Sequence, residues 1–406
     1  MRASPLLRPV FGPTPRLIAH GVLVGVRGGV LAFGFEELVK VAQHLLLEGI
    51  GGYTPPSAGE LAPESEIPVG RSRLWLPVVT TLGGLLSGFL VYRFAPETEG
   101  HGTDAAIDAY HRRGGDIRPR VPLIKAVTSA LTIGSGGVAG KEGPTAQISV
   151  GLATMIAKRT RLRGQARRHL LLAGMAAGLA AMFRAPLGMA IFSVEILYAG
   201  MAVEAEALIY TVIAAVTAYA TFGVLSGWER LFAVPAGLEL QSPAVLPTFI
   251  LLGLLAGVVG ALLPWMLERT RLFFRRLPVW PHVKPAIGGL VLGLVAVADP
   301  RILGTGYGWM EMAMVEALPL SALVFILFSK GPGMALTIGS GGSGGVFAPT
   351  VAIGGLLGAL TGSLLHGVGI AESMPVAGFV VVGMAAVFAG AARTPISTLI
   401  MVAEMT

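Results

Sequence analysis

Long stretches of the chain contain no Asp, Glu, Lys or Arg, and short polar loops separate them. Residues 74–92, 207–228 and 241–267 are each near or above the ~20 residues that a helix needs to span a bilayer. Residues 373–392 form another such stretch, whereas residues 331–371 are too long for one helix and are interrupted by Gly and Pro. This pattern predicts an all-α polytopic membrane protein in which several helices stop partway across the membrane.

Composition supports the same fold class. Of the 406 residues, 53% are hydrophobic and 13% are charged, against about 25% charged in an ordinary soluble domain. Gly occurs 57 times, which suits the close packing of transmembrane helices. There is no Cys, so disulfides and thiolate metal sites are excluded. The net charge of +7 lies in short basic clusters, which we interpret as loops flanking membrane helices and not as a nucleic-acid surface.

The strongest internal signal is a repeat. ALTIGSGG stands at residues 130–137 and again at 335–342, an offset of 205. A second block, Gly-Met-Ala-Ala followed by spaced Arg, Pro and Glu, begins at residue 174 and returns at 383. The chain is therefore a duplication of roughly 200 residues, and in transporters such halves often have inverted topology with the site at their interface. A parallel repeat is the alternative. We divide the chain into residues 1–230 and 231–406.

Both copies centre on a Gly-rich turn that precedes an apolar helix. The start of a helix has unpaired N–H groups and a partial positive charge, and Gly lets the backbone approach a ligand closely. Two such helix starts meeting within the membrane would bind an anion weakly enough for it to leave. Glu142 stands at the first helix start. Its carboxylate could occupy the anion site and block it, or move away when protonated.

Two sets of polar residues leave alternatives open. His101, Asp104, Asp108 and His111 are spaced so that the last three share a helical face, which makes a membrane metalloenzyme the rival from another class. A solvated helix face is the simpler interpretation, and we expect no metal. The two copies also place an acidic residue at equivalent positions, Glu195 and Glu404. Charges in a membrane are costly and often functional, but this symmetry favours a structural role at helix ends.

The motifs identify a resemblance. The segment Gly140-Lys141-Glu142-Gly143-Pro144 is similar to the GREGP motif of the CLC family of chloride channels and proton/chloride antiporters, and GVFAP at residues 345–349 is similar to the family's GGIFAP. The resemblance spans nearly the whole chain. It implies an all-helical inverted repeat whose broken helices meet at a central anion site, with one pore in each subunit of a homodimer. It also implies anion transport and no enzymatic reaction, in the cell membrane of a prokaryote, with no cofactor and no nucleic-acid partner.

The resemblance also implies roles for individual residues. Glu142 resembles the family's gating glutamate, and the backbone amides of Val346 and Phe347 resemble chloride ligands. The family's GSGIP motif falls on residues 100–104, where His101 replaces the anion-binding Ser and could donate an N–H instead. The residues that we expect to bind the anion are His101, Gly102, Gly140, Gly143, Gly345, Val346 and Phe347.

The mode of transport depends on one further position. Many family antiporters carry a second glutamate that hands protons to the gate, and here it aligns with Ile196. Glu195 is adjacent and is our proton-path candidate, although neighbouring helix residues point about 100° apart. The family's last helix, with a Tyr that reaches the chloride, would follow Thr406 and is absent from this sequence. These features favour channel-like chloride conduction gated by Glu142. A proton-coupled antiporter, with protons as a second partner, is the alternative.

Overall fold

The computed structural model describes residues 15–406 except 60–70, 199–204, 236–237 and 241. These residues form helices and two isolated backbone bridges, and no strand was found among them. The helices of the first half are α1 (Pro15–Gln43), α2 (Leu76–Phe94), α3 (Thr103–His111), α4 (Val121–Gly134), α5 (Glu142–Arg159), α6 (Gly164–Phe183), α7 (Pro186–Glu195) and α8 (Ala205–Ser226). Those of the second half are α9 (Leu246–Arg276), α10 (Lys284–Ala298), α11 (Tyr307–Met314), α12 (Leu320–Gly339), α13 (Phe347–Gly367), α14 (Val376–Ala392) and α15 (Pro395–Met405).

The prediction of a polytopic helical membrane protein is confirmed. In the described part of the chain, 7 helical segments are long and apolar enough to cross a membrane, and α4, α7, α14 and α15 are shorter apolar helices. The long charge-free run at residues 331–371 is broken as predicted, because α12 ends at Gly339 and α13 begins at Phe347. Our charge-free criterion missed the span that contains α1, since this helix carries Arg27, Glu36, Glu37 and Lys40.

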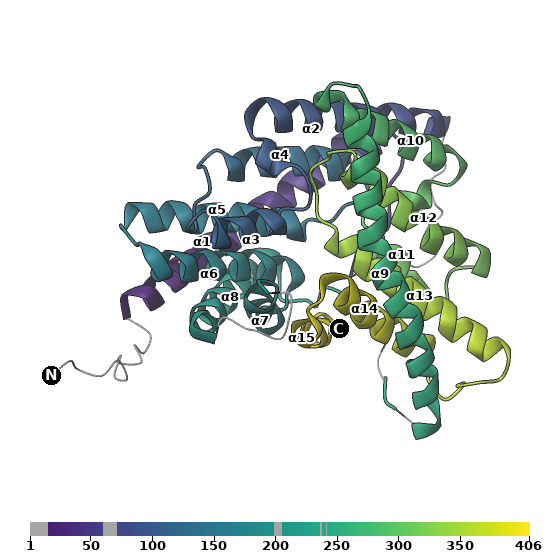
Figure 1. Ribbon diagram of the computed structural model, residues 1–406. Coiled ribbons are helices and arrows are strands. Elements are labelled where there is room, and N and C mark those ends of the chain that lie inside the picture. Colours follow the sequence, from purple (N-terminus) through teal and green to yellow (C-terminus); the bar gives the residue numbers. More distant parts are fainter. Residues whose placement is uncertain (1–14, 60–70, 199–204, 236–237, 241) are drawn as a thin grey trace.

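The repeat is visible as two sets of seven helices in the same order, α1–α7 and α9–α15. Figure 1 shows the first half in purple to teal, largely on the left, and the second half in green to yellow, largely on the right. Equivalent helices pack against each other across the two halves, α2 on α10 and α7 on α15. Glycine makes the first contact possible, because a Cβ on Gly84 of α2 would lie only 2.7 Å from the carbonyl carbon of Pro285.

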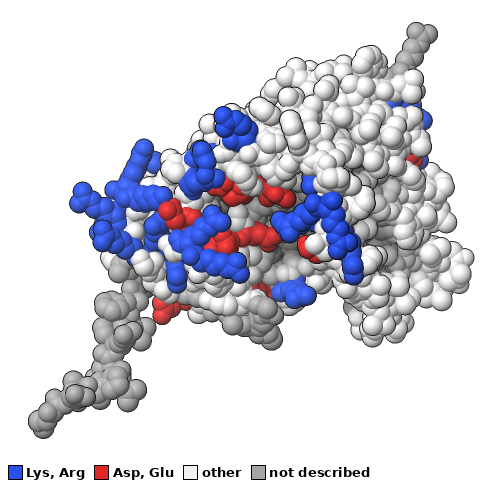
Figure 2. All heavy atoms as spheres, turned by 45° about the horizontal axis from the view of Figure 1, so that its top comes forward, with Lys and Arg blue, Asp and Glu red and all other residues white. Residues whose placement is uncertain are grey.

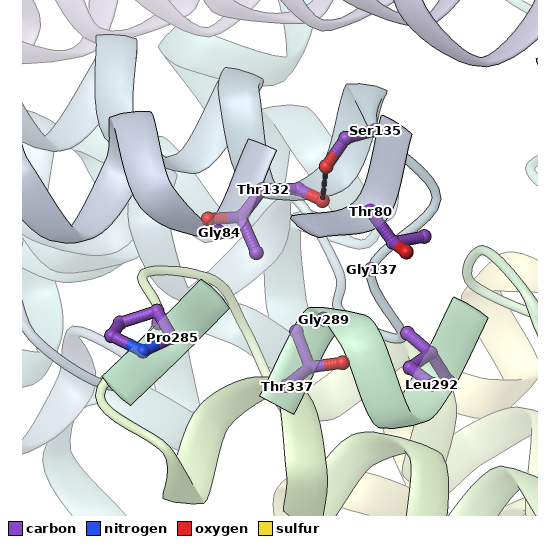
Figure 3. Close-up of a pocket in the computed structure, with 10 residues that line it drawn as sticks. Thr80, Gly84, Thr132, Ser135, Gly137, Pro285, Gly289, Leu292 and Thr337 are labelled. Carbon is purple, nitrogen blue, oxygen red and sulfur yellow. Dashed lines mark hydrogen bonds between the residues drawn. The ribbon is translucent and has the colours of Figure 1, made fainter. Parts of the chain in front are cut away.

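A small polar pocket lies where α2, α4, α10 and α12 meet (Figure 3). Thr132 and Thr337, which are equivalent residues of the two ALTIGSGG copies, both line it, and the Oγ of Ser135 donates to the carbonyl of Thr132 at 3.1 Å. Its volume of about 20 Å³ is that of a single water site. The halves therefore meet through equivalent residues in the middle of the structure.

The surface divides into charged and apolar areas. Figure 2 shows Lys, Arg, Asp and Glu gathered over one part of the visible face, while a broad area beside it carries none of them. Apolar side chains are exposed on the long helices, for example Ile250, Leu254 and Val258 of α9, which are spaced four residues apart and are 66–68% exposed. Such a stripe faces lipid in a membrane protein.

Candidate anion site

Three Gly-rich segments meet at the centre of the molecule. Gly140 and Gly345 exchange two backbone hydrogen bonds, with N–O distances of 2.7 and 2.8 Å. The segment between α2 and α3 joins them, because the N–H of Gly100 donates to the carbonyl of Gly342 at 3.0 Å and the N–H of Gly344 donates to the carbonyl of Gly100 at 3.2 Å. The two halves are thus joined through their repeated Gly-rich turns, as the sequence predicted.

Two helix starts flank this junction. Helix α5 begins at Glu142 and α13 begins at Phe347, each two residues after a bridging glycine. Gly143 lies tightly between the segments, since a Cβ there would be 3.2 Å from the Gly345 Cα and 3.3 Å from the carbonyl carbon of His101. The structure therefore gathers the predicted anion-binding positions into one cluster: His101, Gly102, Gly140, Gly143, Gly345, Val346 and Phe347.

The Glu142 side chain is buried, with only 2% of its surface exposed. Its Oε1 accepts a hydrogen bond from the Tyr307 hydroxyl at 3.0 Å, and its Oε2 has no hydrogen-bond partner among the described residues. A Cβ on Gly140 would collide with this Oε2 and would lie 3.1 Å from the backbone nitrogen of Ala348. The carboxylate of the first half therefore lies over the first turn of α13, where N–H groups are unpaired within the helix.

Tyr307 is a site residue that the sequence analysis missed. It is the first residue of α11 and follows Gly306, whose φ is +92°. Its ring packs edge-on against Phe232, with 4.9 Å between the ring centroids. The available signal was the match between this turn and the equivalent start of α3, where Gly102 has a φ of +94°.

Two cavities reach the helix starts, one lined by Glu142 and the other by Phe347. The charged cavity has a volume of about 410 Å³, and Glu142 and Tyr307 line it. The other charged residues that line it are Glu36, Lys40, Lys141, Arg184, Glu229 and Arg230. The apolar cavity has a volume of about 270 Å³, and its lining includes Val346, Phe347 and Ile196. The two cavities share no lining residue among the described residues, and Glu142 and Phe347 line different ones.

Phe347 is held in place by a cluster of aromatic rings. Its ring lies edge-on to Phe192 and Phe388, with centroid separations of 5.4 and 5.2 Å, and Phe183 stacks on it at 6.1 Å. Because these rings come from α6, α7 and α14, they fix the start of α13 against three helices.

His101 does not have the free N–H that we expected an anion to use. Its Nδ1 lies 2.7 Å from the Thr103 hydroxyl oxygen, and its Nε2 lies 2.9 Å from Asp104 Oδ2. Both ring nitrogens are therefore engaged by residues of its own segment. The carbonyl group of His101 packs against Gly143 in the cluster.

The four residues considered as metal ligands do not converge. Asp108 pairs with Arg113 at 2.7 Å, and the Nε2 of His111 lies 3.0 Å from the carbonyl oxygen of Leu197. Among the described residues, no group of three or more His, Cys, Asp or Glu side chains is placed to hold a metal ion. The helix face is organised by ion pairs and backbone contacts instead.

Two buried lysines hold the loops that lead into the site. Lys125 of α4 donates from Nζ to the carbonyls of Thr98 and Gly100 at 3.0 and 2.6 Å. Lys330 of α12 donates to three carbonyls at 2.7–3.0 Å, those of residues 302, 303 and 304. The lysines are 205 residues apart, so the repeat offset could have revealed them. Each fixes the segment before an equivalent helix, α3 or α11.

The paired glutamates are reciprocal helix caps. The Glu195 carboxylate at the end of α7 accepts from the N–H groups of Ile396 and Ser397, at 3.2 and 2.9 Å, at the start of α15. The Glu404 carboxylate near the end of α15 accepts from the N–H groups of Leu187 and Gly188, at 3.0 and 2.8 Å, at the start of α7. This geometry supports the structural role over the proton path for Glu195.

The fold and the site define a polytopic helical protein whose two repeated halves meet at a buried junction of Gly-rich turns. The family model described as "Voltage gated chloride channel" matches residues 83–406. The chain therefore belongs to the voltage-gated chloride channel (CLC) family, whose members are membrane transport proteins and not enzymes. The metalloenzyme alternative is accordingly wrong.

Relatives extend over most of the chain. It is 30% identical over 416 residues to the H(+)/Cl(−) exchange transporter ClcA of Vibrio parahaemolyticus, an alignment that covers 97% of this chain and 83% of that one. A protein of Ralstonia nicotianae whose name describes a ClcB-like chloride channel protein is 28% identical over 397 residues, and the alignment covers 89% of that protein. Among solved structures, a slow cyanobacterial Cl−/H+ antiporter superposes with a TM-score of 0.82 at 24% identity, over 97% of this chain and 90% of that one. The last comparison establishes the shared fold.

Proposed function

We propose that the protein exchanges chloride for protons across the membrane, with Glu142 as the gate. The observation that carries this proposal is the buried Glu142 carboxylate, which lies at the junction of two helix starts and lines one of the two cavities. The names of the ClcA relatives support the proton-coupled alternative better than the channel-like mode that the sequence favoured.

In this proposal one site serves both ions. When Glu142 is charged, its carboxylate takes the place of an anion, held by the Tyr307 hydroxyl and by the partial positive charge at the start of α13. Protonation removes the charge, so the side chain leaves and chloride binds at the backbone amides of Val346 and Phe347. Helix dipoles supply only fractional charge, which allows the ion to be released again.

Three further features belong to the proposal. Residues 1–230 and 231–406 form the two repeats of one pore unit. Two copies of the chain assemble as a homodimer in a lipid bilayer, and each copy contains its own pore. Exposed apolar stripes such as that on α9 support the bilayer setting.

The test measures chloride and proton movement together in liposomes containing the purified protein. We expect a chloride gradient to drive protons uphill at a fixed ratio. Glu142→Gln, which keeps the shape and cannot ionise, should abolish proton transport and make chloride flux insensitive to pH. Glu37→Gln is the matched control, because Glu37 is 46% exposed and pairs only with Lys40 on the same helix.

Chloride flux without proton movement in the unaltered protein would contradict exchange and support channel-like conduction. A normal proton-to-chloride ratio in Glu142→Gln would remove Glu142 from the mechanism.

A further inference from the structure

We propose that His101 and Asp104 form a proton-transfer pair that links the solution at the apolar cavity to Glu142. This inference rests on the proposed proton/chloride exchange. In this proposal, proton exchange requires a titratable group at each of the two cavities. On the side of the charged cavity Glu142 is itself in the lining, but on the other side no role has yet been assigned to any titratable residue.

The apolar cavity narrows the choice to two side chains. Among the described residues that line it, His101 and Asp104 alone are ionisable. Ile196, which aligns with the second glutamate of many family antiporters, also lines this cavity and cannot carry a proton. The remaining lining is almost entirely hydrocarbon, with residues such as Leu263, Met334 and Phe388. A proton that enters through this cavity therefore meets only this pair.

Asp104 is the more exposed member of the pair, and His101 is the more buried one. The Asp104 side chain is 70% exposed, whereas that of His101 is 20% exposed, and Asp104 Oδ2 lies 2.9 Å from His101 Nε2. Asp104 can thus take a proton from water at the cavity mouth and pass it to the imidazole. Histidine suits this role because its charge changes between about pH 5 and 8.

The surrounding charges keep Asp104 ionised between transfers. Although the Asp104 side chain is largely exposed, desolvation by the surrounding protein raises its pKa; the hydrogen bond and charge of His101, together with the charge of Arg271, outweigh this and hold the pKa of Asp104 below its usual range. Lys125 is the other nearby cation, and its Nζ is engaged by the carbonyls of Thr98 and Gly100.

The backbone of His101 packs against the gate segment. The carbonyl carbon of His101 would be 3.3 Å from a Cβ on Gly143, the residue after Glu142. The cavity volume of about 270 Å³ leaves room for several waters at about 30 Å³ each. Transfer from the imidazolium through water reaches Glu142 once its carboxylate has left Tyr307. Each step breaks and forms only N–H and O–H bonds, so the proton balance is complete.

The test is the proton-to-chloride ratio in liposomes. Asp104→Asn keeps the shape and a hydrogen bond to His101, and it should reduce proton transport about tenfold or more, with chloride flux changed less than about twofold because no chloride ligand is altered. His101→Gln should also reduce proton transport, and Asp104→Glu should restore proton transport. The matched control is Asp108→Asn, since Asp108 stands on the same helix but pairs with Arg113.

A merely structural pair would lower both fluxes together and leave their ratio unchanged, and that outcome overturns the proposal. Unchanged proton transport in both Asp104→Asn and His101→Gln also overturns it. The unaltered protein is measured first. If it moves no protons uphill, the proposed exchange fails before the pair is tested, and the two failures are therefore distinct.

Discussion

The two Gly-rich turns at residues 137–143 and 342–348 have similar backbone arrangements and different side chains. Gly140 and Gly345 are equivalent and bond to each other, and α5 and α13 begin two residues later in each case. At that equivalent position the first half has Glu142 and the second has Phe347. The first side chain lines the charged cavity and the second lines the apolar one. The two halves thus have similar helix starts, and the residue at which they differ in the first half, Glu142, is the gate that we propose.

The starts of α3 and α11 show the same division. Both follow a glycine with positive φ, Gly102 or Gly306, and a buried lysine holds the segment before each. The first start carries His101 and Asp104 toward the apolar cavity, whereas the second carries Tyr307 toward Glu142. Residues that match between the halves fix the backbone of these segments, and the residues that differ are those to which we assign roles in transport.

The largest effect should come from the matched lysines. Lys330→Met leaves three buried carbonyls without a donor, and Lys125→Met leaves two. At about 1 kcal/mol or more for each unsatisfied group, we expect losses of about 3 and about 2 kcal/mol in the free energy of unfolding. Unfolding in mixed detergent micelles measures both, with Lys40→Met as control because Lys40 is 58% exposed. Losses no larger than the control's would contradict a scaffold role.

The matched glutamates should follow. Glu195 accepts three hydrogen bonds, including one from the Ser397 hydroxyl at 2.5 Å, whereas Glu404 accepts two and is less buried. We expect Glu195→Ala to cost about 2 kcal/mol and Glu404→Ala about 1 kcal/mol, as for other caps. Thermal unfolding of both variants in one detergent makes the comparison.

A flux measurement separates the cap from a proton path. Glu195→Gln should keep the proton-to-chloride ratio of the unaltered protein. A reduced ratio in a well-folded Glu195→Gln would reinstate this residue as a proton carrier.

The smallest effect should come from the unmatched Tyr307. Tyr307→Phe removes one hydrogen bond from the Glu142 carboxylate, and such a bond favours the charged form. Glu142 should therefore bind its proton more readily, so half-maximal chloride flux should move to higher pH, by roughly one unit. Flux against pH in liposomes measures the shift. It should vanish in the Glu142→Gln background, and Tyr219→Phe, whose ring contacts Trp228 instead, should leave the profile unchanged. A shift that persists without the Glu142 carboxylate would rule out this contact as its cause.

Periodicity and spacing were sufficient for the scaffold. The repeat offset and the charge-free stretches predicted the helices, the break before Phe347 and the meeting of Gly140 with Gly345. The charge-free criterion missed the span that contains α1, because a few charged residues interrupt its long apolar run. Tyr307 escaped because it is far from Glu142 in sequence and because the Gly-x-Gly turn before it, at residues 304–306, repeats that at residues 100–102 without a longer matching motif.

The amino-acid sequence alone was sufficient for the fold class and the duplication, because helical spans and backbone turns depend on local composition and on Gly, and it singled out Glu142 as the gate that we propose. The partners of each polar side chain were decided only by the tertiary structure. Both ring nitrogens of His101 are occupied, Glu195 caps a distant helix, and Glu142 bonds to Tyr307. A buried polar group must find a partner wherever the packing places one, and residues 165 or 202 positions apart become neighbours only when the two halves close on each other.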